Sequence, residues 1–341
     1  MTELSLIRPE AAPEVGPEIV WAYVFEGGGV GRPLSGLPDL SAERGPGFVW
    51  LHLDLVHSAT RDWLTQMEPT FGAAADTLIS ADAHPHIDWS RDLLWGVVRD
   101  VHREVDKAGE HASDLRFVVG PRFLVTGRRR PMQAAHALMR KVETGAEYEG
   151  SAQLFEALLT EIAEAVGRVA NRTAERLEEV EDSVLSASVS DERATLLTLR
   201  REVARYARLA SSLSAVVVRL EQAGAAGLPD HCRGLSARLG QRVASIHADV
   251  HYLADHARML NDEVGGQVAA QANRHLFILT VLTTLLLPPS LVTGYFGMNT
   301  KNLPFADSEY GTLFASFIAI VAALSVYLLM RRNRMIGSGG A

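Results

Sequence analysis

The clearest feature of the hydrophobic pattern lies near the end of the chain, where two long runs carry no charged residue. The first covers residues 276–296 and the second covers residues 312–330. At about 1.5 Å per residue, helices of these lengths reach about 31 and 28 Å, which matches a hydrocarbon layer about 30 Å thick. A buried core helix of that length usually shows a polar stripe, and the second run has none. The pattern therefore predicts two transmembrane helices.

The first 148 residues show the pattern of a cytosolic α/β domain. Short runs rich in Val, Phe and Trp predict strands at 19–25, 47–53, 93–101, 115–119 and 122–126. Between them, helices are predicted at 58–67, 70–80 and 131–144. The domain is therefore expected to hold a sheet of five to seven strands. The glycine-rich stretch 27–31 has no following Lys-Ser/Thr pair and opens no helix, so we interpret it as a hairpin loop.

Residues 149–275 are predicted to be almost entirely helical. A hairpin over 149–229 joins two charged helices, 151–185 and 191–222, through a Ser-rich turn. A stalk helix over 230–275 then runs without an evident stop into the first apolar run. Its apolar residues recur at steps of four and three, as in a coiled coil: Leu239, Val243, Ile246, Val250, Leu253, Ala257, Leu260 and Val264. This heptad seam fits packing within the chain or association between copies, and its continuation toward the membrane favours association.

Charge and cysteine content exclude several classes of protein. The formal net charge of −8 argues against a nucleic-acid partner, which would require a basic surface. The single cysteine, Cys232, excludes an intrachain disulfide and a multi-cysteine metal site. We find no nucleophile, base and acid set, no Walker lysine and no nucleotide fingerprint, so an enzyme is not expected and no cofactor is implied.

Flanking charges predict the orientation in the membrane. Arg331 and Arg332 follow the second run and Arg274 precedes the first, and positively charged flanks stay on the cytoplasmic side. Both termini, including the basic tail 331–341, are thus expected in the cytoplasm, with the loop 297–311 outside. The start of the chain shows no signal-peptide pattern. We expect a multi-pass protein of a bacterial-type inner (plasma) membrane.

A short motif follows the first run, in the context LLPPSLVTGYFGMNTKNLPF. The triplet Gly297-Met298-Asn299 closes a proline-containing span, precedes a short outer loop and a second span, and is followed by a basic C-terminus. In this arrangement the chain resembles the CorA-type two-span metal-ion transporters over its whole length. Phe296 directly before the triplet and Leu303-Pro304-Phe305 after it depart from the magnesium-transporting members. Together with the 47–54 stretch GFVWLHLD, they are more similar to the ZntB branch of zinc transporters.

The resemblance implies an α+β membrane protein that assembles as a funnel-shaped homopentamer, with five first spans around one pore. It implies transport of a divalent cation, Zn²⁺ first, with Mg²⁺, Co²⁺, Ni²⁺ and Cd²⁺ as alternatives. A magnesium or cobalt channel of the same family stays open. So does a different class, a membrane-anchored oligomeric sensor or scaffold, which would have the same stalk and anchor. The partners implied are further copies of the chain, the lipid bilayer and divalent cations.

One face of the first span suits the lining of such a pore. Stepping back from the motif by three and four residues gives a face of small, hydroxylated and leucine side chains: Leu276, Thr280, Thr283, Leu287, Ser290 and Gly294. Hydroxyl rings can touch the water shell of an ion, and leucine collars can gate by dewetting. The alternative is that the hydroxyls only bond the carbonyls of their own helix. At the outer mouth, Gly297 allows close approach, the Asn299 amide can accept hydrogen bonds from metal-bound water, and Met298 is expected to pack the loop.

Other candidate cation sites lie outside the spans, since neither span contains His, Cys, Asp or Glu. Acids expected to attract cations lie in the outer loop and in one cytosolic helix: Asp307, Glu309, Glu175, Glu178, Glu179, Glu181 and Asp182. The helix acids are also explained by simple solvation. On the stalk, His247, His251 and Asp255 follow one another at four-residue steps, a spacing that suits Zn²⁺, although a solvated helix flank gives the same pattern.

Overall fold

The computed structural model describes residues 17–38, 40, 47–80, 84–102, 111–185, 189–298 and 310–332. The chain divides into two compact units, Met1–Asn261 and Asp262–Ala341. The first unit contains a sheet and most of the helices, and the second contains two apolar helical segments. This is the α+β class with two apolar C-terminal helices that the sequence predicts.

A seven-stranded sheet forms the centre of the first unit, with the order β2-β1-β3-β7-β6-β5-β4. Only β3 and β7 pair in parallel among the described strands, and every other neighbouring pair is antiparallel. The strands are β1 (Ile19–Glu26), β2 (Gly31–Pro33), β3 (Gly47–Asp54), β4 (His86–Trp89), β5 (Leu94–His102), β6 (His111–Gly120) and β7 (Phe123–Arg128). All five predicted strands are confirmed. The edge strands β2 and β4 were not expected, because they are too short to show an alternating pattern.

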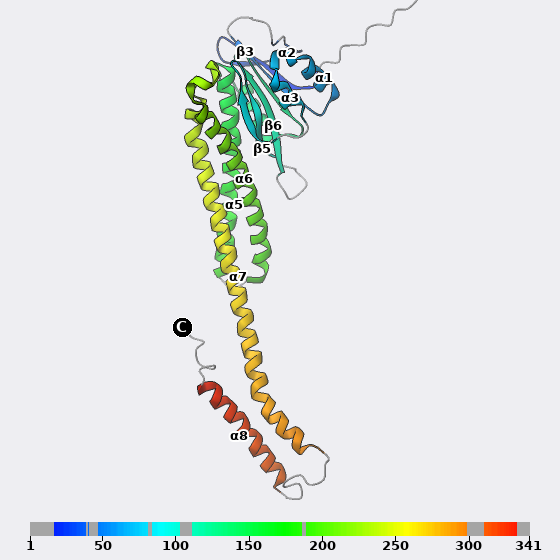
Figure 1. The fold of residues 1–341 in the computed structure, drawn as a ribbon, viewed down its shortest axis with the longest axis vertical. Coiled ribbons are helices and arrows are strands. Elements are labelled where there is room, and N and C mark those ends of the chain that lie inside the picture. Colours follow the sequence, from blue (N-terminus) through cyan, green and yellow to red (C-terminus); the bar gives the residue numbers. More distant parts are fainter. Residues whose placement is uncertain are drawn as a thin grey trace, which may run out of the picture. The chain divides into compact units, whose positions relative to one another are not determined.

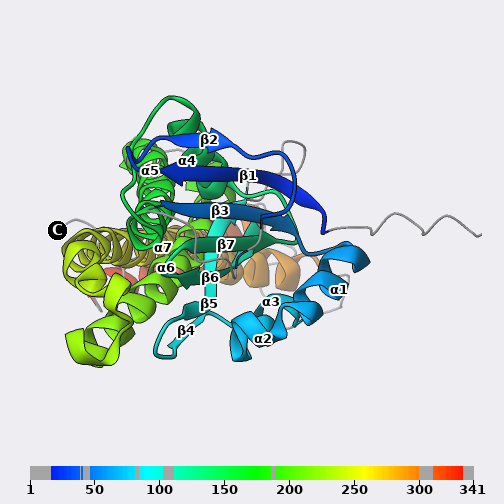
Figure 2. The ribbon, with the colours of Figure 1, turned by 90° about the horizontal axis from the view of Figure 1, so that it is seen from above.

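The central strand β3 is buried on both faces of the sheet. Phe48 and Trp50 point into one core, and Leu51 and Leu53 point into the other. The first core lies against α4 (Gln133–Glu143) and the helical bundle, and the second lies against α1 (Ser58–Gln66), α2 (Glu68–Phe71) and α3 (Ala73–Ile79). Figure 2 shows the sheet between these two groups of helices. This layering explains why the strands are nearly continuous apolar runs.

Of two local predictions in the α/β domain, the structure corrects one and confirms the other. The helix expected over 70–80 is split into α2 and α3, because Gly72 takes φ 53°, outside helical geometry. The glycine stretch after β1 does form the predicted hairpin loop: the Gly29 amide donates to the Glu26 carbonyl at 2.9 Å, and β2 returns antiparallel to β1.

Three long helices form a bundle against the sheet: α5 (Ser151–Leu185), α6 (Val189–Gly227) and the first part of α7 (Leu235–Phe296). Figure 1 shows them side by side. The hairpin of α5 and α6 is confirmed. The break expected at 223–230 is confirmed: α6 kinks at Gly224, with φ 63°, and ends at Gly227. The stalk helix begins at Leu235 rather than at residue 230, because Asp230–Cys232 form a 3₁₀ turn.

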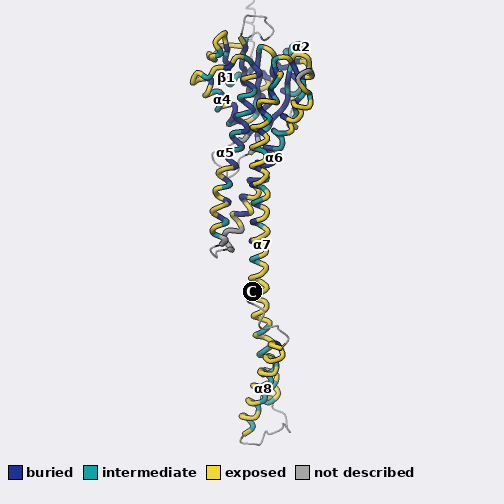
Figure 3. The backbone as a smooth tube through the Cα atoms, turned by 90° about the vertical axis from the view of Figure 1, so that its left-hand side faces the viewer, coloured by how far each residue is buried: buried dark blue, intermediate teal, exposed yellow. Residues whose placement is uncertain are grey.

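The heptad seam of α7 is buried within the single chain. Leu239, Val243, Val250, Ala257 and Val264 are at most 3% exposed, and Ile246 contacts the same core as Leu239. Figure 3 shows buried positions recurring along α5 and the first part of α7. The hypothesis that this seam joins separate copies is therefore wrong for its part in the first unit, where Leu239 and Val243 share one core with residues of α5 and α6.

The second unit contains the rest of α7 and α8 (Gly311–Arg332). These are the two described helices that are long and apolar enough to cross a membrane. Most of their residues are exposed in the single chain, as the yellow segments of Figure 3 show. A core helix of a soluble protein would be covered, so the exposure fits helices that contact lipid or further copies of the chain.

Candidate ion-conduction site

All six predicted pore-lining residues of α7 are exposed in the single chain. Leu276 is 61% exposed and Leu287 is 66% exposed. The four smaller members between and beyond them are also exposed: Thr280, Thr283, Ser290 and Gly294. At about 100° per residue, all six fall within one narrow stripe of the helix surface. This hydroxylated stripe has no partner among the described residues, so it is free to meet other copies or water.

The opposite face of α7 is less exposed. Its half-buried positions are Val281, Leu285, Pro288, Pro289, Val292 and Phe296. The same rotation per residue places this stripe roughly opposite the hydroxylated stripe. On α8 the less exposed positions form a stripe of small and aliphatic side chains: Ala315, Ile318, Ala319, Ala322, Ala323, Val326 and Met330. Figures 1 and 3 show the two helical segments side by side within this unit.

Small residues let two helices approach closely in lipid, where packing drives association. We therefore interpret the Ala-rich stripe of α8 as the surface that packs on the half-buried stripe of α7. The hydroxylated stripe is left on the outside of this helix pair. On this interpretation, α8 covers one face of α7, and the exposed hydroxylated stripe is available to line a pathway.

The hydroxyl groups of the stripe bond to the backbone of their own helix. Thr280 Oγ1 donates to the Leu276 carbonyl at 2.8 Å, Thr283 Oγ1 donates to Leu279 at 2.9 Å, and Ser290 Oγ donates to Leu286 at 2.8 Å. The alternative hydrogen bonding considered from the sequence is therefore present. It does not compete with pore lining, since a hydroxyl has one donor and two acceptor lone pairs. Because the hydroxyl hydrogen is donated to the helix backbone, the lone pairs of each oxygen can accept hydrogen bonds from water or contact a cation directly.

Two consecutive prolines, Pro288 and Pro289, lie inside α7 without ending it. Proline has no backbone N–H, so the carbonyls four residues earlier, on Thr284 and Leu285, lose their helical partner. Both prolines are half-buried on the face that α8 covers. In lipid an unpaired carbonyl costs several kcal/mol, so these oxygens require protein or water as neighbours.

The structure describes Gly297 and Met298 of the motif, and Asn299 lies outside the described residues, as do Asp307 and Glu309. The Gly297 amide donates to the Thr293 carbonyl at 2.9 Å, which closes the last turn of α7. A Cβ at Gly297 would lie 3.0 Å from that same oxygen, so a larger residue would crowd the turn. Met298 is exposed rather than packed in the single chain.

The acidic cluster of α5 lies mostly on the bundle surface. Glu175, Glu178, Glu179 and Asp182 are exposed, and Glu181 lies 3.2 Å from His256 Nε2 on α7. The cluster is thus a solvated helix face with one contact to α7. Its role in attracting cations stays a prediction, and the cluster forms no enclosed site.

His247 and His251 do face one another, at the boundary between α6 and α7. Their ring centroids are 4.4 Å apart, and both Nε2 atoms approach Ser211 Oγ of α6, at 3.3 and 3.0 Å. Burial and the neighbouring His251 lower the pKa of His247. Asp255 points instead to Arg258, 3.2 Å away. Among the described residues no three His, Cys, Asp or Glu side chains gather as a metal site, so the predicted three-ligand set is not assembled.

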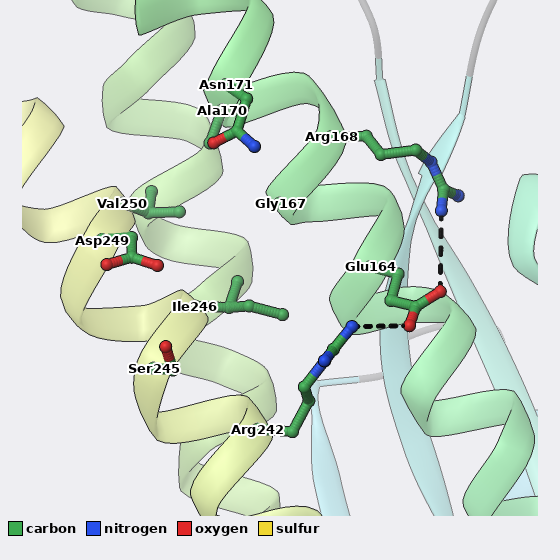
Figure 4. A pocket seen from close by; sticks show the side chains of 10 residues that line it. All are labelled: Glu164, Gly167, Arg168, Ala170, Asn171, Arg242, Ser245, Ile246, Asp249 and Val250. Atoms are coloured by element: carbon green, nitrogen blue, oxygen red, sulfur yellow. Dashed lines mark hydrogen bonds and ion pairs between the residues drawn. The ribbon is translucent and has the colours of Figure 1, made fainter.

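Contacts between α5 and α7 were not predicted from the sequence. Figure 4 shows Glu164 of α5 between Arg242 of α7, at 2.8 Å, and Arg168 of its own helix, at 3.8 Å. Close by, Gly167 leaves room for Ile246 of α7. A Cβ added at Gly167 would lie 3.8 Å from the Ile246 side chain. These contacts fix the register of α7 on the bundle. Charge spacing along one helix gives no signal for a partner 78 residues away.

Comparison with known proteins identifies the family. The family described as CorA-like Mg2+ transporter protein matches residues 45–332 of the chain. The chain is 24% identical to the divalent cation transporter CmaX of Pseudomonas aeruginosa, over 95% of this chain and 99% of that protein. It is 20% identical to the zinc transport protein ZntB of Yersinia pseudotuberculosis, over 94% of this chain and 96% of that protein.

Solved structures show the same fold. The full-length CmaX structure matches with a TM-score of 0.69 and 22% identity, over 95% of this chain and all of that one. The CorA magnesium transporter of Methanocaldococcus jannaschii matches with a TM-score of 0.70 and 20% identity, over 92% of this chain and 98% of that one. The family match covers far more than half of the sequence, and the fold agrees along nearly its whole length. The chain belongs to the CorA-like Mg2+ transporter family.

Proposed function

We propose that the protein moves a divalent metal cation across the inner (plasma) membrane through a homopentameric pore lined by the hydroxylated stripe of α7. The observation that carries this proposal is the difference between two faces of α7: one face is half-buried, and Thr280, Thr283 and Ser290 remain exposed on the other. Family membership supports the transport of a divalent cation, and the two apolar helices support a location in the membrane.

The chemistry of the stripe favours an ion that keeps much of its water shell. Neither span contains a carboxylate, imidazole or thiol that would replace water on Zn²⁺ or Mg²⁺. The hydroxyl oxygens can accept hydrogen bonds from the shell instead. At the outer mouth, five copies of Asn299 would form a neutral ring of amide oxygens that do the same. Gly297 would let the five chains approach closely there.

The preference for zinc rests on the loop residues and the ZntB relatives, with Mg²⁺, Co²⁺, Ni²⁺ and Cd²⁺ as competing ions. Asp307 and Glu309 outside, and the acids of α5 inside, would raise the local cation concentration at the two ends of the path. Five copies multiply the charge of each group by five, which strengthens the focusing of cations.

Transport into proteoliposomes tests the proposal. Purified protein is reconstituted with a zinc-sensitive dye inside, and Zn²⁺ is added alone or in competition with Mg²⁺, Co²⁺, Ni²⁺ or Cd²⁺. Protein-dependent dye signal is expected, and Asn299→Ala is expected to abolish it while insertion and assembly persist. Asn302→Ala, in the same loop, is the matched control and should retain flux. A Zn²⁺ signal no greater than that of empty liposomes would refute zinc transport, and unchanged flux in Asn299→Ala would remove the motif from the path.

A further inference from the structure

A basic groove lies between α4 and α5 in the first unit. It encloses about 760 Å³, within the range of sites for small molecules. Its rim carries five basic side chains: Arg128, His136, Arg140, Arg168 and Arg172. No Asp or Glu is among the described residues that line it. The chain as a whole has a net charge of −8, so a groove lined by basic and no acidic side chains differs from the rest of the protein.

The basic side chains come from three elements that converge on the groove. His136 and Arg140 are one turn apart on α4, and Arg168 and Arg172 are one turn apart on α5. Residues at this spacing lie on the same face of a helix. Arg128 is the last residue of β7. Its Cζ lies 6.0 Å from the centroid of the Trp21 ring, and this contact holds the guanidinium in place. The arginines therefore line the groove both from α4 and from α5.

Nearby carboxylates are engaged by other bases. Glu161 of α5 forms an ion pair with Lys141, and Glu164 is closer to Arg242, at 2.8 Å, than to Arg168, at 3.8 Å. The positive potential of the groove is therefore only partly neutralised. The described residues that line the groove include no acid, so an anion bound there would reduce the repulsion among its basic side chains.

The floor of the groove is apolar. Met132, Ala165 and Val169 line it and are nearly fully buried themselves. Arginine forks match the oxygens of phosphate groups in two-point contacts, and an apolar floor suits a flat ring. A free phosphate ion would leave most of the volume empty.

We propose that this groove binds a nucleoside polyphosphate, with the phosphate chain along the arginines and the base over the apolar floor. Nothing in the ion path requires such a ligand, so the site is separate from the conduction site. Because α4 belongs to the α/β domain and α5 to the bundle, a bound nucleotide would join these two parts of the first unit.

Isothermal titration of the full-length protein in detergent, in metal-free buffer, tests the proposal. ATP is expected to bind saturably at one site per chain, about tenfold more tightly than AMP, because added phosphates gain contacts with guanidinium groups. Arg140→Glu, and the milder Arg140→Gln, should weaken ATP binding roughly tenfold or more, as the loss of one charge-assisted hydrogen bond predicts. Arg61→Glu, an exposed arginine on α1, makes the same charge change outside the groove and should leave affinity unchanged.

Three results would overturn the proposal. They are no saturable ATP binding at millimolar concentration, equal affinity for AMP and ATP, and equal effects of Arg140→Glu and Arg61→Glu. Inorganic tripolyphosphate is the further probe, expected to bind more weakly than ATP. If it binds as tightly as ATP, the base contributes nothing and the nucleoside part of the proposal is wrong.

Discussion

Removing a seam leucine from α7 should destabilise the single chain rather than only its assembly. Leu253 is 7% exposed and Leu260 is 4% exposed, so both side chains leave water almost completely on folding. Leu→Ala at such sites costs about 2–5 kcal/mol, since it combines lost burial with a residual cavity. We expect about 3 kcal/mol for either substitution. The two residues are two helical turns apart, so the double variant should lose about 6 kcal/mol, the order of a whole domain's stability.

Urea unfolding of the full-length protein in detergent measures this loss, at two protein concentrations that differ by about tenfold. If the seam packs within the chain, the drop in the midpoint of Leu253→Ala is the same at both concentrations. Met259→Ala is the matched control, because Met259 lies on the same helix between the two leucines and is 63% exposed. It should leave the midpoint nearly unchanged. An unchanged midpoint in Leu253→Ala, or a loss that disappears at high concentration, would refute the intramolecular seam.

Three further predictions concern the spans and the α/β domain. Leu287→Ser should raise basal cation flux in proteoliposomes by wetting the collar, whereas Leu286→Ser, one residue off the stripe, should not; the reverse result would mean that the helical phase is wrong. Burial, with Arg128 nearby, holds the pKa of His52 well below its ordinary value. Stability should therefore fall as the pH drops below about 6.5, where the unfolded chain takes up a proton that folded His52 does not. Thermal unfolding between about pH 7 and 5 should show a flatter pH dependence in His52→Gln. A Cβ at Gly96 would collide with the His86 carbonyl, so Gly96→Ala should displace β4 and cost about 1–3 kcal/mol in urea unfolding; an unchanged midpoint would contradict the strand register.

The strands and the long helices could be predicted because their patterns are local. Apolar alternation and runs of Val and Phe identify the strands from β1 to β7, except the two short edges. The helical period identifies α5 to the residue, and uncharged length identifies the two spans. Each of these signals lies within the element that it predicts.

The predictions that failed concern residues whose contacts lie far away in the sequence. The seam of α7 has the same heptad pattern whether its partner is the chain's own α5 or a second copy, so its pattern cannot choose between them. Likewise His247, His251 and Asp255 were a candidate metal site, with a solvated helix flank as the alternative, and the two histidines contact Ser211 of α6 instead. The split at Gly72 is a separate, local miss, since it depends on a backbone angle that the pattern of apolar residues does not encode.

Thiol accessibility tests the central claim, that the hydroxylated stripe of α7 lines the path, most directly. The chain offers a clean background, because its single cysteine, Cys232, is buried and burial raises its thiol pKa to about 12. Single cysteines are placed at Thr283 and Ser290 on the stripe and at Val281 and Val292 on the covered face, in Cys232→Ser protein. Cation flux into proteoliposomes is measured before and after a charged, membrane-impermeant thiol reagent. We expect block at Thr283 and Ser290 and none at Val281 or Val292; block at the covered face with free flux at the stripe would contradict the account.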